Sequence, residues 1–186
     1  MIFDRQGLGG NALPNRGCQR MEIRVLGCYG SQIPGYGLTG FLIDAKTLLD
    51  AGAVTSVLTL EEQAGVDHIL ITHAHLDHIG RIPKLYRDGF RGRIFATHPT
   101  LDLARLSLDD SLHLLKEEAE ELNQKPLFTE DDLVNCWKLT HGRPYHQDIE
   151  INPNIKIKFN DAGHILGSSI VEVFLSEAGR KVKIVF

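Results

Sequence analysis

The chain has 186 residues, of which 42% are hydrophobic and 24% charged, which is typical of a globular protein and excludes a disordered one. Its formal net charge of −4 excludes a strongly basic protein that holds nucleic acid through bulk charge. Its apolar runs are too short for a transmembrane helix, and its three cysteines (Cys18, Cys28 and Cys136) form no CxxC pair. We therefore expect a cytoplasmic protein with no membrane segment and no disulfide framework.

The first part of the chain differs in composition from the rest. Residues 1–20 contain four glycines and no hydrophobic period, which predicts a disordered or non-native leader. A strand pattern begins directly after Met21. We therefore expect the folded part to cover residues 21–186.

The predicted elements begin with strands, continue with helices and end with strands. Alternating or continuous apolar residues predict strands at 22–26, 39–43, 46–49, 66–72, 92–96, 155–160, 169–175 and 181–186. Helices are predicted at 58–63, from Asp77 onward, at 101–122 and at 129–139, the last beginning with a Thr129–Asp132 capping box. This order predicts an α/β or α+β sandwich. Because the last strand has no terminating turn, we expect the chain to stop inside its domain.

Four candidate metal ligands lie within six residues, in the pattern HxHxDH at His73, His75, Asp77 and His78. Two histidines that are two positions apart after a strand point to the same side, and a turn into a helix brings the aspartate and the third histidine near. One pair of side chains is therefore expected to bind one metal ion and the other pair a second. Imidazoles and a carboxylate suit zinc, with iron or manganese as alternatives.

A second cluster follows 86 residues later in the sequence Asp161-Ala-Gly-His164. His164 would complete a set of three nitrogen ligands with His73 and His75. Asp50, at the end of a strand, is expected to orient a ligating imidazole, with a plain turn aspartate as the alternative. Asp161 is assigned the same supporting role. The remaining histidines are interpreted as structural or surface residues: His68, His98, His113, His141 and His146.

THAHLDHIGRIP (72–83) and DAGHILGSS (161–169) resemble the second and third signature motifs of metallo-β-lactamase-fold hydrolases. They are most similar to the β-CASP branch of RNA-processing nucleases, which includes the mRNA 3′-end cleavage and polyadenylation specificity factor. LLDAG (48–52) resembles the first motif, and the segments 82–97 and 127–133 also follow that branch. A glycine-rich stretch at 27–37 lacks a P-loop lysine and is interpreted as a loop beside the metal site.

The resemblance implies an αββα sandwich, a dinuclear zinc site and hydrolysis of RNA phosphodiesters by a hydroxide that bridges the two metals. In that arrangement His73, His75 and His164 bind one zinc. Asp77 and His78 bind the other, and Asp77 also acts as the catalytic residue that steers the hydroxide. Asp50 supports the site from behind the ligands.

The chain departs from the family in what it lacks. It ends before the fourth motif, a Ser-Gly-Asp-like turn, and it contains no β-CASP cap domain. We therefore expect an N-terminal fragment with little nuclease activity of its own, whose full-length form acts on RNA. Whether it forms a homodimer stays open.

Two other functions remain as alternatives. The short segment between the first two motifs is reminiscent of cyclic-nucleotide phosphodiesterases of the same fold, which favours a small-molecule hydrolase. The other alternative is a catalytically inactive RNA-binding or scaffold subunit.

Overall fold

The computed structural model describes residues 22–30, 37–177 and 179–186 and contains two β-sheets. The predicted leader at 1–20 and most of the glycine-rich loop lie outside these residues. The first sheet has the strand order of the sequence: β1 (Ile23–Gly27), β2 (Gly40–Ile43), β3 (Thr47–Leu49), β4 (His68–Leu70), β5 (Arg93–Thr97) and β6 (Thr140–Arg143). Strands β3 to β6 are mutually parallel, so their carboxyl ends meet at one edge.

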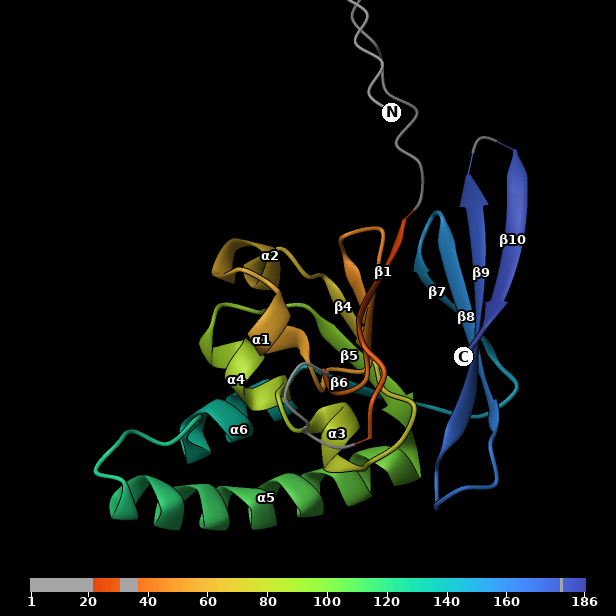
Figure 1. The fold of residues 1–186 in the computed structure, drawn as a ribbon. Helices are drawn as coiled ribbons and strands as arrows, with labels where there is room; N and C mark the ends of the chain where they lie inside the picture. The colour runs from red at the N-terminus through yellow and green to blue at the C-terminus, as the bar shows by residue number, and fades with distance from the viewer. Residues whose placement is uncertain (1–21, 31–36, 178) are drawn as a thin grey trace, which may run out of the picture.

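The second sheet is antiparallel and packs against one face of the first. Its strand order is β10-β9-β8-β7, with β7 (Asp148–Asn152), β8 (Ile155–Asp161), β9 (Ser169–Glu177) and β10 (Arg180–Val185). Helices cover the opposite face of the first sheet (Figure 1). The described residues therefore form three layers, one of helices and two of strands, which correspond to the αββ part of the predicted αββα sandwich.

Within the described part of the chain, six helices make up the helical layer: α1 (Val54–Val57), α2 (Leu60–Ala64), α3 (Leu76–Ile79), α4 (Ile82–Arg87), α5 (His98–Glu121) and α6 (Glu130–Trp137). The predicted capping box is present, since the Thr129 side chain accepts from the Asp132 backbone and the Asp132 carboxylate accepts from Thr129 N. No helix among the described residues is long and apolar enough to span a bilayer.

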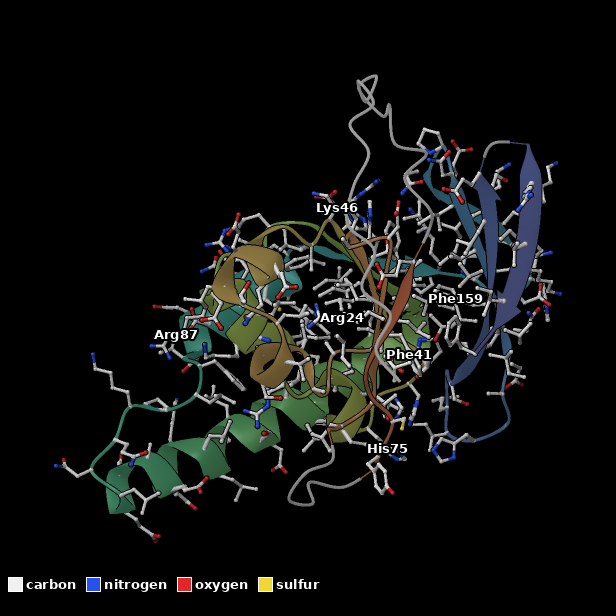
Figure 2. The ribbon with its side chains drawn as sticks, turned by 45° about the horizontal axis from the view of Figure 1, so that its top comes forward. Arg24, Phe41, Lys46, His75, Arg87 and Phe159 are labelled. Carbon is white, nitrogen blue, oxygen red and sulfur yellow. The ribbon has the colours of Figure 1, made fainter. Side chains whose placement is uncertain are left out.

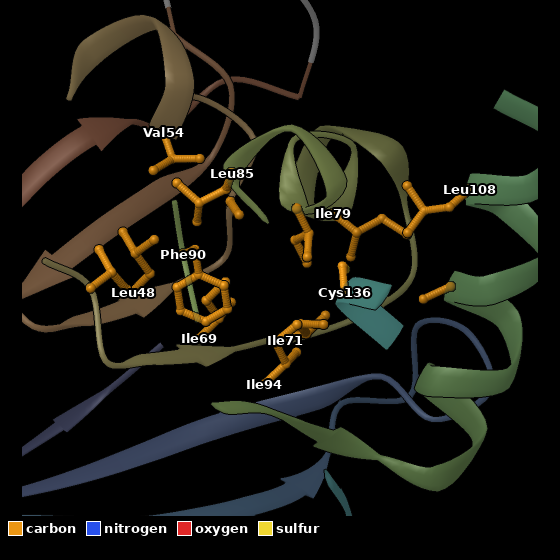
Figure 3. Close-up of a cluster of buried hydrophobic side chains, with 14 of the residues drawn as sticks. Leu48, Val54, Ile69, Ile71, Ile79, Leu85, Phe90, Ile94, Leu108 and Cys136 are labelled. Atoms are coloured by element: carbon orange, nitrogen blue, oxygen red, sulfur yellow. The ribbon is translucent and has the colours of Figure 1, made fainter. Parts of the chain in front are cut away.

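Two hydrophobic clusters fill the spaces between the layers. Between the helices and the first sheet, Leu48, Ile69 and Ile94 face Leu85 and Phe90, and all five are almost fully buried (Figure 3). Between the sheets, the inward residues of β8 and β9 pack on Ile43, Leu49, Leu70 and Phe95. Since each central strand is covered on both faces, its apolar residues run continuously instead of alternating.

The predicted hairpin turn is confirmed at Asp44 and Ala45, whose φ angles of 50° and 53° join β2 to β3. The long helix is also confirmed, starting three residues before the predicted position. Strands β6 and β7 were not predicted. The sequence THGR of β6 has no apolar residue, and its strand conformation comes from pairing with β5.

Candidate metal centre

Asp50 occupies a buried position directly after β3. It is 1% exposed and has a φ of 56°, a left-handed conformation that aspartate tolerates better than most residues. Its Oδ1 accepts the backbone N–H of Thr72 at 2.9 Å, and its Oδ2 accepts the Thr72 hydroxyl at 2.8 Å. The same Oδ2 lies 2.7 Å from Nδ1 of His78. One carboxylate thus links the end of β3 to both ends of the HxHxDH segment.

Thr72 extends this support to a second imidazole. Its Oγ1 lies 2.9 Å from Nδ1 of His73. Because the hydroxyl donates its proton to Asp50, its oxygen is free to accept the Nδ1 proton of His73. Both His73 and His78 therefore have Nδ1 engaged and Nε2 available for a metal, the usual arrangement of ligating histidines.

The pKa values of these two histidines move in opposite directions. Burial, followed by the charges of the neighbouring histidines His78, His75 and His164, outweighs the charge of Asp50 and lowers the pKa of His73 to about 4. Burial also opposes protonation of His78, but the hydrogen bond to Asp50 and the charges of Asp50 and Asp77 outweigh it and raise the pKa of His78. At neutral pH, His73 is thus a neutral imidazole, the form that binds metals.

Three imidazoles from two separate loops converge on one point. The ligand atoms of His73, His75 and His164 all lie within 4.8 Å of one another. Nε2 of His73 is 3.1 Å from Nδ1 of His75, and Nε2 of His164 is 3.3 Å from that same atom. Zn–N bonds of about 2.0–2.1 Å in tetrahedral geometry place ligand nitrogens about 3.3 Å apart. The donor set therefore fits a zinc ion in both chemistry and spacing.

The loop that carries His164 connects β8 to β9 and is fixed by contacts to the first sheet. The buried Ser168 Oγ accepts the backbone N–H of His164 at 3.1 Å. The carbonyl of Gly167 accepts the hydroxyls of Thr97 and Thr100, both at 2.7 Å. Ser169 N donates to the Thr72 carbonyl at 2.8 Å and ties the loop directly to the HxHxDH segment.

Asp77 and His78 lie in the first turn of helix α3, beside the three histidines. Oδ2 of Asp77 is 3.3 Å from Nε2 of His78, and the rings of His73 and His78 are 4.0 Å apart. The backbone here packs tightly on the Asp50 loop, since Ala51 N donates to the His78 carbonyl at 2.7 Å. A Cβ on Gly52 would lie 1.8 Å from the Asp77 carbonyl oxygen, so only glycine fits there.

A cavity of about 400 Å³ opens between the two sheets beneath the imidazoles. Phe41, Ile170 and Phe186 form apolar parts of its wall, and His73 and His164 form polar ones. Phe41 lies in the space between the sheets and His75 at the lower rim of the first sheet (Figure 2). An apolar cavity with a few convergent polar groups is the usual form of a small-ligand site.

The structure brings six of the seven predicted site residues together: Asp50, His73, His75, Asp77, His78 and His164. The seventh, Asp161, is exposed and its carboxylate accepts the backbone N–H of Gly163 at 2.9 Å, where it shapes the turn before His164. Sequence reasoning missed Thr72, Thr97 and Ser168. Thr72 and Ser168 lie inside the motifs, but nothing in the sequence indicates their partners.

A family model described as "Metallo-beta-lactamase superfamily domain" matches residues 41–185. Transcription termination factor FttA of Methanocaldococcus jannaschii is 39% identical over 60% of this chain and 17% of its own length. Ribonuclease TTHA0252 of Thermus thermophilus is 39% identical over 57% of this chain and 22% of its own length. An RNase J-like protein of M. jannaschii is 34% identical over 76% and 29%, respectively. The chain thus spans less than a third of each of these relatives.

Solved structures share the fold at low sequence identity. YhfI of Bacillus subtilis, a metallo-beta-lactamase fold protein, has a TM-score of 0.57 and 18% identity, covering 88% of this chain and 61% of YhfI. The FEZ-1 metallo-beta-lactamase of Legionella gormanii has a TM-score of 0.56 and 14% identity, covering 88% and 59%. These structures confirm the predicted metallo-β-lactamase fold.

Proposed function

Because the chain belongs to the metallo-beta-lactamase superfamily, we propose that its histidine cluster binds two divalent metal ions, zinc above all, and that the protein hydrolyses RNA phosphodiesters. His73, His75 and His164 bind one ion, and Asp77 and His78 bind the other. The observation that carries the proposal is the spacing of the imidazole nitrogens, 3.1 and 3.3 Å, across two loops 89 residues apart. Iron or manganese would suit the same donors.

The chain's own residues orient the ligands and handle the proton. Two divalent ions, when bound, supply an activated water and stabilise the charge that develops on the phosphodiester. Asp50 holds His78 directly and His73 through Thr72, so neither ring can turn away from the site. Asp77 is the one ligating carboxylate and lies partly exposed beside His78. It is therefore placed to accept a proton from the attacking water, which is the catalytic role we assign to it.

RNA as the substrate is supported by the relatives. Two of the three named above are called a ribonuclease or an RNase J-like protein, and the third is a transcription termination factor. Together with motifs that resemble the β-CASP branch, these names favour an RNA-processing nuclease over other hydrolases of the fold. Since the chain covers less than a third of each relative, we assign this activity to the protein in which the chain works as the metal-binding part.

The cavity between the sheets favours one alternative. Its volume of about 400 Å³ and partly apolar wall suit a small molecule, as in a cyclic-nucleotide phosphodiesterase. The two functions differ in the substrate that is hydrolysed. The assay below therefore offers both.

The test measures bound metal first and hydrolysis second. The purified chain is dialysed against Zn²⁺, Mn²⁺ or Fe²⁺, and the metal per chain is counted by elemental analysis. The variant His164→Ala should lose about one equivalent, since it removes one of three ligands, whereas His113→Ala, exposed on α5, should retain all of it. Equal loading of both variants would contradict the ligand set.

Hydrolysis is then followed with end-labelled single-stranded RNA and with a cyclic nucleotide, each with metal and with EDTA. We expect metal-dependent cleavage of RNA, slow in this chain and faster in any longer form. Turnover of the cyclic nucleotide alone would favour the small-molecule alternative. Metal binding without turnover of either substrate would favour the inactive subunit.

A further inference from the structure

A group of basic side chains surrounds Phe95 at the open edge of the first sheet. Arg93 precedes Phe95 by two positions on β5, and His141 on β6 is the register partner of Phe95. The guanidinium carbons of Arg93 and Arg143 lie 5.4 and 5.5 Å from the centroid of the Phe95 ring, and the His141 ring is 5.5 Å away. Stacking on one buried ring thus holds two arginines and a histidine close together.

This cluster, which we call the β5–β6 basic edge (Arg93, His141 and Arg143), forms no ion pair in the part of the chain that the structure describes. No carboxylate among those residues lies within ion-pair distance of either arginine. Asp148 and Glu150 line a cavity of about 220 Å³ beside Arg143, but Asp148 pairs with Lys158 at 3.0 Å.

The positive charges in this cluster act on one another. Burial lowers the pKa of His141, and the charges of Arg143 and Arg93 lower it further. The cation–π contacts with Phe95 offset part of this repulsion. An anion bound at the basic edge would remove the remaining repulsion between the positive charges. It would also gain strong charge-assisted hydrogen bonds, because an arginine fork matches the oxygens of a phosphate.

The basic edge is connected to the metal centre through the sheet. Arg143 is the register partner of Thr97, whose hydroxyl holds the carbonyl of Gly167 in the His164 loop. Two residues further along, the Tyr145 hydroxyl donates to the carbonyl of Ser168 at 2.9 Å. A strand that leaves the metal centre over this loop would therefore meet Arg143 first and then His141 and Arg93.

We propose that the β5–β6 basic edge binds backbone phosphates of the single RNA strand whose neighbouring segment lies at the metal centre. The identity of the polymer rests on the proposed function. A polymer is favoured over a single phosphate because the basic groups follow the strands, with residues two positions apart separated by about 6.6 Å along a β-strand. Among the described strands, β6 pairs with β5 alone, and all four of its residues are partly exposed.

The test is RNA binding in EDTA, where metal-dependent cleavage cannot occur. The affinity of the chain for a short fluorescein-labelled single-stranded RNA is measured by fluorescence anisotropy over a series of salt concentrations. The double variant Arg93→Gln/Arg143→Gln should raise Kd about tenfold at low salt. The slope of log K against log salt concentration should become shallower by about 0.7 for each arginine removed. Arg143→Lys retains the charge but loses the guanidinium fork, so its salt slope should stay as in wild type while its Kd rises by less than that of the double variant.

Arg91→Gln is the matched control. Arg91 also stacks on an aromatic ring, 4.1 Å from the centroid of Tyr86, and its guanidinium donates to two backbone carbonyls. It should leave Kd and the salt slope unchanged. Thermal unfolding of each variant separates loss of packing from loss of binding, since a merely structural arginine would shift Tm without changing the salt slope.

Wild-type affinity and slope in the double variant would overturn the proposal, as would a wild-type chain that does not bind the RNA. Failure of the proposed function gives a different result from failure of this inference. In that case RNA binding that depends on the two arginines could be present while metal binding or cleavage is absent. Cleavage of RNA together with unchanged RNA binding in the arginine variants would support the proposed function and contradict the inference about the basic edge.

Discussion

Oδ2 of Asp50 lies 2.7 Å from Nδ1 of His78, although the two residues are 28 positions apart in the chain. This contact joins the carboxyl end of β3 to the first turn of α3. It fixes the orientation of an imidazole whose other nitrogen faces Asp77. Because Asp50 is buried, the carboxylate has no access to water that could replace this partner.

Asp50→Asn should weaken the binding of metal at Asp77 and His78 by about 10- to 100-fold, the usual effect of removing the hydrogen-bond partner of a ligating histidine. Asparagine tolerates the left-handed backbone at this position, so the loop should keep its shape. Binding is measured by competition with a chromophoric chelator. Asp67→Asn, whose exposed carboxylate pairs with Lys46, is the control and should bind as wild type. Equal metal affinity in the two variants would show that Asp50 does not support the ligating histidine.

Gly167→Ala should strongly destabilise the His164 loop. Gly167 has a φ of 83°, and an added Cβ would lie 2.4 Å from the backbone nitrogen of Thr100. Gly179 has a similar φ of 80° with nothing within 4 Å of an added Cβ. Alanine at Gly179 should therefore cost about 1–2 kcal/mol from backbone strain alone, and alanine at Gly167 roughly 2 kcal/mol more. Urea denaturation of both variants measures the loss of free energy of unfolding. An equal loss in the two variants would show that the His164 loop adjusts to the added Cβ without further destabilisation.

The stability of the metal-free protein should fall in mildly acidic solution, in part because of His68. This residue is 8% exposed, and burial followed by the charge of Arg93 lowers its pKa below the ordinary value of 6.5. Below that pH the unfolded chain binds a proton that the folded chain resists, so the contribution of His68 is complete above about pH 6.5 and is lost as the pH falls.

The measurement for His68 is the free energy of unfolding in urea against pH, in EDTA. His68→Gln should flatten the decline, whereas His113→Gln, an exposed substitution on α5, should leave it as in wild type. A decline that is unchanged in His68→Gln would assign the acid sensitivity to other groups.

Cys136 should be inert to thiol reagents in the folded protein. Burial raises the pKa of its thiol to about 12, and the thiolate is the reactive form. Cys28 is exposed. In a Cys18→Ser background, iodoacetamide at mildly alkaline pH should modify Cys28 rapidly and Cys136 after unfolding in urea, as read by peptide mass spectrometry. Rapid modification of Cys136 in the native state would indicate that α6 opens easily.

Much of the fold and most of the candidate site could be predicted from local sequence. The hairpin at Asp44-Ala45 and the capping box at Thr129 depend on residues within three or four positions of one another, and both are present. The HxHxDH segment follows a buried apolar strand, which places its candidate ligands at the end of a parallel sheet. His164 was identified by its motif, and the structure places it beside His73 and His75.

The tertiary structure decided the contacts between segments that are distant in the sequence. The edge strand β6, with its sequence THGR, becomes a strand because β5 offers it hydrogen-bond partners. The turn that Asp50 occupies could equally have been a surface turn, and its role depends on burial beside His78. The hydroxyls of Thr97 and Thr100 reach Gly167 from 70 and 67 positions away. Local sequence specifies backbone conformation and residue type, but which polar groups meet is determined by the packing of two sheets, where an unpaired buried group would be too costly to leave.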